Sequence, residues 1–119
     1  MILVDTSVWI EHLRRGEPTL TDHLLNAQVL IHPLVIGELA MGNLTQRTDT
    51  LRWLGDLPRS VVATDQEVMD LVTREALHGR GIGYLDAHLL ASVRLTHDAR
   101  LWTLDRRLSE VAMELGLTH

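Results

Sequence analysis

The chain of 119 residues is 45% hydrophobic, carries a formal net charge of −5 and contains no cysteine. The length and composition predict one globular domain over residues 1–119. The absence of cysteine excludes disulfides, thiolate nucleophiles and cysteine-based metal sites. Because the sequence shows no signal-peptide pattern and no apolar run of about 18 residues, we expect a cytoplasmic protein with no membrane partner. All 11 basic residues are arginine, which binds phosphate in a bidentate geometry, so the acidic net charge does not exclude a nucleic-acid partner.

Short apolar runs alternate with helical segments along the chain. The first half predicts a strand at Ile2–Val4, helices at Val8–Leu13 and Thr19–Asn26 (with "TLTD" as a capping-box-like start), a strand in "QVLIHP", and helices at Pro33–Met41 and Thr48–Leu54. The second half predicts a strand at Ser60–Ala63, helices at Asp65–His78 and Tyr84–Leu95, a strand at Leu101–Leu104, a helix at Arg106–Leu115 and a short edge strand in "GLTH". This alternation predicts an α/β fold with a mostly parallel central sheet of about five strands, covered by helices on both faces.

Two acids stand where apolar strands are expected to end. Asp5 follows the run in "MILVDTS", and Asp105 follows the run in "LWTLDRR". In open α/β sheets, ligands bind beyond the carboxyl ends of the strands, so both acids are candidates for a site. Asp is also a favoured helix N-cap residue, and capping alone would explain either acid. Thr6 and Ser7 would serve equally well as caps of the first helix.

A third acid after an expected strand, Asp65, behaves differently. In "TDQE", Thr64 and Glu67 have the spacing of a capping box, so local helix capping accounts for the acids there. We therefore leave Asp65 out of the candidate site.

Two further acids lie in expected helices. Glu38 is the one charged residue in "PLVIGELAMG", where a carboxylate on an apolar stripe is costly to bury unless it is paired or binds a metal; the alternative is an exposed glutamate. Asp86, in "GIGYLDAHLL", stands in the first turn of its helix, where the helix dipole alone favours an acid.

Taken together, Asp5, Glu38, Asp86 and Asp105 form an oxygen-rich set. Carboxylate oxygens favour Mg²⁺ or Mn²⁺ over zinc or copper. Four neighbouring carboxylates would repel one another unless a cation offset their charge. Such a centre can lower the pKa of a bound water and stabilise the attacking and leaving oxygens of a phosphodiester.

The residues around these acids resemble those of PIN-domain ribonucleases, and within them the VapC-type toxins of toxin–antitoxin pairs. The resemblance covers essentially the whole chain and rests on four segments in order: "MILVDTSVWIE", "IHPLVIGELAMG", "GIGYLDAHLLAS" and "LWTLDRRL". The sequence differs from some members of that family in one respect. They have another acid beside the fourth one, whereas here Asp105 is followed by Arg106 and Arg107.

The resemblance implies a three-layer α/β/α fold and Mg²⁺- or Mn²⁺-dependent endonucleolytic cleavage of RNA, leaving a 5′-phosphate and a 3′-hydroxyl. The four acids would hold the metal directly or through water, and Thr6 or Ser7 would bind a metal-bound water or a phosphate. It also implies a homodimer and inhibition by a cognate VapB-type antitoxin.

Four other residues are candidate contacts for RNA or antitoxin: Arg80, His88, Arg106 and Arg107. For the arginines the alternative is a solvated surface position, and for His88 it is packing or hydrogen bonding.

Two other functions stay open. The chain could be a PIN-like module that only binds RNA or protein. It could also be an aspartyl phosphotransferase, because "LVDTS" resembles the strand-end Asp of haloacid-dehalogenase-like phosphatases; those enzymes have a second acid two residues later, where this chain has Ser7.

Overall fold

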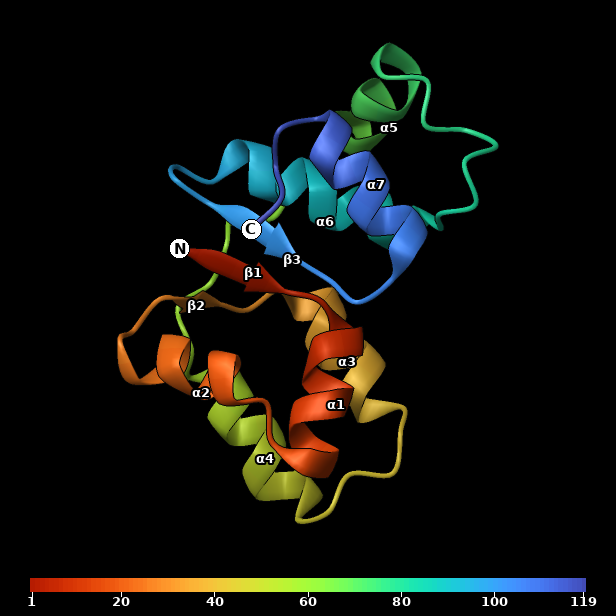
Figure 1. Ribbon diagram of the computed structural model, residues 1–119. Helices are drawn as coiled ribbons and strands as arrows, with labels where there is room; N and C mark the ends of the chain where they lie inside the picture. The colour runs from red at the N-terminus through yellow and green to blue at the C-terminus, as the bar shows by residue number, and fades with distance from the viewer.

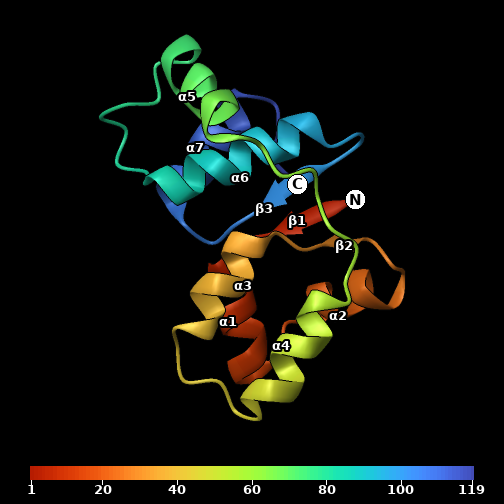
Figure 2. The same cartoon turned by 180° about the vertical axis from the view of Figure 1, so that it is seen from behind.

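Three short parallel strands form the centre of the computed structural model, which describes residues 1–119 (Figures 1 and 2). They are β1 (Ile2–Val4), β2 (Val29–Leu30) and β3 (Arg100–Trp102), in the order β2-β1-β3. Leu3 of β1 lies opposite Leu30 on one side and Leu101 on the other. Because both pairings are parallel, the carboxyl ends of β1 and β3 point to the same edge of the sheet.

Seven helices cover this sheet from both sides. They are α1 (Thr6–Arg15), α2 (Pro18–Leu25), α3 (Pro33–Ala40), α4 (Arg47–Gly55), α5 (Asp65–Arg74), α6 (Tyr84–Leu95) and α7 (Arg106–Glu114). Helices α1 to α4 lie on one side of the strands and α5 to α7 on the other, which gives the expected three layers (Figures 1 and 2). None of the helices has both the length and the apolar composition that crossing a membrane requires.

The expectation of about five strands was wrong, because the expected strand Ser60–Ala63 does not form and the expected edge strand in "GLTH" is reduced to a single bridge. Arg59 pairs with Ile31 beside β2, and Thr118 pairs with Leu101 beside β3. In the expected strand Ser60–Ala63, the amides of Val61 and Ala63 donate to the hydroxyls of Thr96 and Ser92, at 2.9 and 3.2 Å. The segment thus uses hydroxyl groups at and near the end of α6 in place of a neighbouring strand.

Helix ends follow local capping, with two corrections. Pro33 occupies the first turn of α3 as expected, and Thr64 and Glu67 form the expected capping box at α5. The capping-box-like "TLTD" was wrong: Glu17 caps α2 by accepting a hydrogen bond from the Thr19 amide. Helix α5 ends at Arg74, before the expected His78, and Ala76 just beyond it has a left-handed φ of 51° that no α-helix continues through.

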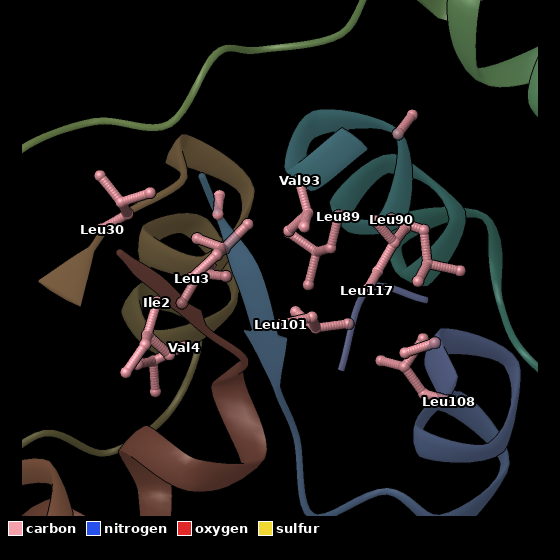
Figure 3. Close-up of a cluster of buried hydrophobic side chains, with 14 of the residues drawn as sticks. Ile2, Leu3, Val4, Leu30, Leu89, Leu90, Val93, Leu101, Leu108 and Leu117 are labelled. Carbon is pink, nitrogen blue, oxygen red and sulfur yellow. The ribbon is translucent and has the colours of Figure 1, made fainter. Parts of the chain in front are cut away.

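The core lies between the sheet and the two helical layers (Figure 3). All three residues of β1 are buried, which explains why that strand is continuously apolar. On the α6 and α7 side, Leu89, Leu90 and Leu108 pack near Leu101 of β3 (Figure 3). The buried strands thereby fix the position of the chain at the edge where Asp5 and Asp105 emerge.

Helix α2 offers a test of this packing within one element. Leu20 is fully buried in the core, whereas Leu25 in the same helix is 80% exposed. We expect Leu20→Ala to lower the free energy of unfolding by about 2–5 kcal/mol, because it leaves a cavity, and Leu25→Ala to change it by less than about 0.5 kcal/mol. Chemical denaturation of both variants measures the difference. Equal effects would contradict the packing of α2 described here.

Candidate active site

Asp5 lies buried at the junction of β1 and α1. Its backbone amide donates to the Trp102 carbonyl of β3, which continues the strand pairing. One carboxylate oxygen caps α1 by accepting from the Thr6 amide at 2.8 Å. The other accepts from the hydroxyls of Ser7 and Thr103, at 2.9 and 2.7 Å. Asp5 therefore caps α1, which confirms the helix-capping role expected from the sequence. Hydroxyl groups from two chain segments also hold its carboxylate.

Thr103 connects this carboxylate to Asp105. The Thr103 hydroxyl donates to Asp5 and accepts from the Asp105 amide at 3.0 Å. Asp105 caps α7 by accepting from the Leu108 amide at 2.9 Å, and its side chain is exposed. The two strand-end acids are thus brought to one place by a shared threonine that the sequence analysis did not identify. A hydroxyl two residues before a strand-end acid, in "TLD", is the signal that would have found it.

Glu38 reaches the same place from α3. Its carboxylate accepts a hydrogen bond from the Thr6 hydroxyl at 2.7 Å, which directs it toward the start of α1. The side chain is exposed, so Glu38 is not a buried carboxylate on an apolar stripe and the alternative of an exposed glutamate holds. The link to Thr6 still associates Glu38 with Asp5. Thr6 and Ser7 both donate to acids of the set and neither caps α1.

Asp86 completes the group from the first turn of α6. One of its oxygens accepts from the Gly83 amide at 3.0 Å, which is the role of a first-turn acid. Burial raises the pKa of Asp86, and the negative charges of Asp5, Asp105 and Glu38 raise it further, whereas the Gly83 amide acts to lower it. All three other acids therefore contribute to the raised pKa of Asp86.

No positive charge compensates this cluster of four acids. The ion pairs of the molecule all involve other carboxylates: those of Glu11, Glu75, Glu110, Glu114 and Asp65. A set of carboxylates and hydroxyls with no cationic partner fits a hard divalent cation. No three of the side chains already stand close enough to ligate one ion, so such a cation would have to draw them together.

The four candidate contact residues differ in their surroundings. Arg80 pairs with Glu114 at 2.8 Å, and Arg106 pairs with Glu110 at 3.3 Å. The side chain of Arg107 lies against Gly81 and takes part in none of the ion pairs. His88 is buried and its Nε2 is 3.1 Å from Asp65, so the structure supports packing and hydrogen bonding for this residue.

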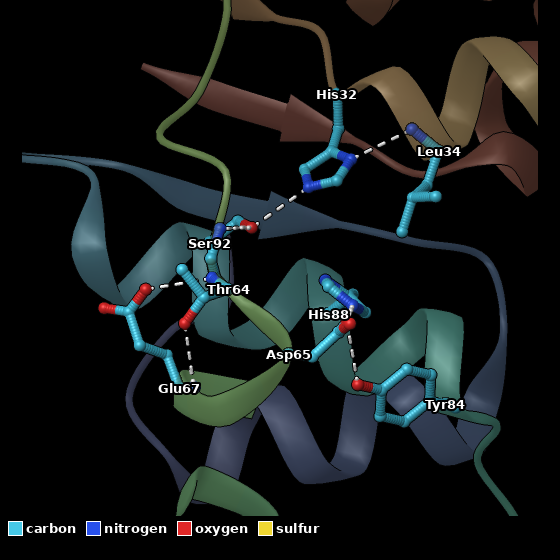
Figure 4. A network of polar contacts seen from close by, with 9 residues as sticks. His32, Leu34, Thr64, Asp65, Glu67, Tyr84, His88 and Ser92 are labelled. Carbon is cyan, nitrogen blue, oxygen red and sulfur yellow. Dashed lines mark hydrogen bonds and ion pairs between the residues drawn. The ribbon is translucent and has the colours of Figure 1, made fainter. Parts of the chain in front are cut away.

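His88 belongs to a polar network between α3, α5 and α6 (Figure 4). His32 caps α3 by accepting from the Leu34 amide, and its other ring nitrogen lies 3.0 Å from the Ser92 hydroxyl of α6. Burial lowers the pKa of His32 to about 4, with smaller effects of the charges of His88 and Arg59. The neutral His32 thus ties the start of the helix that carries Glu38 to the helix that carries Asp86.

A cavity of about 510 Å³ opens beside Glu38, between α1 and the chain that follows α3. Apolar side chains form part of its lining, among them Ile10 and Leu13, which are 46% and 40% exposed, and Arg14 lies at its edge. Glu38, one of the four acids, therefore lines a partly apolar cavity.

Residues 2–114 match the PIN domain, so the chain belongs to the PIN domain family. Two curated relatives are similar over nearly the whole chain, both named Ribonuclease VapC32, from the CDC 1551 and H37Rv strains of Mycobacterium tuberculosis. Each is 50% identical over 117 residues, which cover 98% of this chain and 94% of the relative. The resemblance to VapC-type PIN proteins, drawn from four short segments, is confirmed.

The raised pKa of Asp86 predicts how a substitution there changes thermal stability. Because its pKa is raised in the folded protein, Asp86 ionises there at a higher pH than in the unfolded chain, and this ionisation lowers stability as pH rises through the folded-state pKa. We therefore expect Asp86→Asn to raise the Tm of metal-free protein at pH 7. The gain should vanish below the ordinary pKa of 3.8, where Asp86 is protonated in both states.

Thermal unfolding in EDTA at the two pH values measures this effect. Asp49→Asn is the matched control, because Asp49 is an exposed first-turn acid of α4, away from the cluster. It should leave Tm unchanged or lower it slightly, through loss of the favourable helix-dipole interaction. A lower Tm for Asp86→Asn at pH 7 would show that repulsion within the cluster is already compensated.

Proposed function

We propose that this protein is a metal-dependent endoribonuclease, acting as the toxin of a type II toxin–antitoxin system. The proposal is supported by the charges of Asp5, Glu38 and Asp105, which come from three other elements and raise the pKa of Asp86. None of these four acids forms an ion pair with a basic side chain. Membership of the PIN domain family and full-length similarity to proteins named Ribonuclease VapC32 support it.

In this proposal the four acids would hold Mg²⁺ or Mn²⁺. When bound, the cation would lower the pKa of a water and offset charge that develops on the phosphodiester. The protein's own hydroxyl groups prepare the ligands: Ser7 and Thr103 hold one oxygen of Asp5, and Thr6 holds Glu38. An acid of the set would accept the proton of the attacking water, and the products would carry a 5′-phosphate and a 3′-hydroxyl.

The proposed partners follow from the same assignment. A VapB-type antitoxin would inhibit the enzyme by placing a segment of its chain in the active-site groove, and the partly apolar cavity beside Glu38 is suited to such a segment. The toxin would act as a homodimer.

Cleavage of a mixed RNA pool by antitoxin-free protein tests the activity. We expect cutting in Mg²⁺ or Mn²⁺, none in EDTA, and a loss of roughly 100-fold or more for Asp86→Asn, because a charged group of the metal site is removed. Asp49→Asn, which changes an exposed first-turn acid of α4 outside the cluster, should cut as the wild type does.

The same assay separates the alternatives. An RNA-binding module without activity would show no cutting with either metal, although circular dichroism showed the protein folded. A phosphotransferase would form an acyl-phosphate on Asp5 when given a phosphorylated substrate. Metal-independent cutting, or undiminished cutting by Asp86→Asn, would contradict the proposed mechanism.

A further inference from the structure

A second cavity, of about 530 Å³, lies next to the acid cluster on the side of α7. Its lining contains no hydrophobic residue: Arg80, Gly81, Asp105, Arg106, Arg107 and Glu110. Asp105, one of the four proposed metal ligands, forms part of the wall, so the cavity borders the proposed metal site. Resting on the proposed function, we propose that Arg107 binds a backbone phosphate of the RNA in this cavity and so positions the strand for cleavage.

The pairing of charges around the cavity singles out Arg107. The guanidinium of Arg80 donates to Glu114 at 2.8 Å, and this bond holds the pKa of Glu114 below its usual range. Arg106 donates to Glu110 one helical turn away, at 3.3 Å. Arg107 has no carboxylate within ion-pair distance and donates no hydrogen bond, so its five N–H groups are available to a ligand.

Arg107 lies against the backbone at Gly81. A Cβ atom at residue 81 would lie 2.6 Å from Nη1 and 2.7 Å from Cδ of Arg107, so the arginine side chain occupies the space that any other residue would fill. Gly81 also has a φ of 80°, which favours glycine. The side chain of Arg107 therefore packs against the backbone at Gly81 while its guanidinium stays exposed to a ligand.

The chemistry of the lining favours a phosphate over a protein segment. A guanidinium binds phosphate through two parallel charge-assisted hydrogen bonds. The surrounding surface is polar throughout, whereas the apolar side chains that a peptide would contact line the other cavity, beside Glu38. Phosphate contacts of this kind fix the register of a nucleic acid without reading its sequence.

Binding of a labelled single-stranded RNA of mixed sequence tests the assignment without requiring cleavage. All variants are made in the Asp86→Asn background and titrated in Mg²⁺. We expect Arg107→Gln to raise Kd roughly tenfold and to reduce the slope of log K against log salt by about 0.7, the loss of one phosphate contact. Arg107→Lys should recover part of the affinity. The matched control Arg106→Gln, which changes the paired neighbour, should alter Kd by less than about twofold.

A glycine pair tests the position of Arg107 independently. Gly79 and Gly81 both have positive φ, of 71° and 80°, but a Cβ at residue 79 meets nothing within 4 Å. Alanine thus introduces backbone strain at either position and displaces Arg107 only at residue 81. We expect Gly81→Ala to weaken RNA binding by less than Arg107→Gln does, because the displaced arginine keeps its guanidinium, and Gly79→Ala to leave it unchanged.

Three results would overturn the inference. The first is an unchanged Kd for RNA in Arg107→Gln, and the second is equal weakening of RNA binding by Gly79→Ala and Gly81→Ala. The third is that Arg107→Gln weakens antitoxin binding and leaves RNA binding unchanged, which would assign Arg107 to the protein partner. The proposed ribonuclease activity fails separately, if protein with Asp86 intact does not cut RNA in Mg²⁺ while the Arg107-dependent binding persists.

Discussion

The parallel pairing of β1 with both of its neighbours is the constraint on which the rest of the structure depends. Leu3 pairs with Leu30 of β2 and with Leu101 of β3, and all three side chains are buried. Because the strands run in the same direction, the chain leaves β1 and β3 at one edge, where α1 and α7 begin. The residues that cap these two helices, Asp5 and Asp105, are therefore brought together by the core.

The four candidate acids have no cationic partner within the fold. Hydroxyl groups and backbone amides hold Asp5, Glu38 and Asp86, but no arginine or histidine pairs with any of the four acids. Burial and the three neighbouring charges raise the pKa of Asp86. A fold that needed these acids only as helix caps would gain stability by pairing or separating them. The absence of a cationic partner for these acids is the physical reason why we propose a cation-dependent function.

The sequence predicted features whose signal is local. The continuous apolar run Ile2–Val4 forms the buried central strand, and the helix at Tyr84–Leu95 has the expected bounds. The run Ser60–Ala63 has the same apolar character but does not form a strand, because its amides bond to hydroxyls that lie about 30 residues later. Thr103 was missed for a similar reason, since its role depends on Asp5, 98 residues away.

The carboxyl pKa of Asp86, measured by carbon NMR titration of metal-free protein and again in Mg²⁺, tests the central claim most directly. We expect a pKa above the ordinary 3.8 without metal, and a clear decrease when Mg²⁺ is added, because a bound cation favours the ionised carboxylate. An ordinary pKa without metal that Mg²⁺ does not change would show that the four acids neither repel one another nor share a cation.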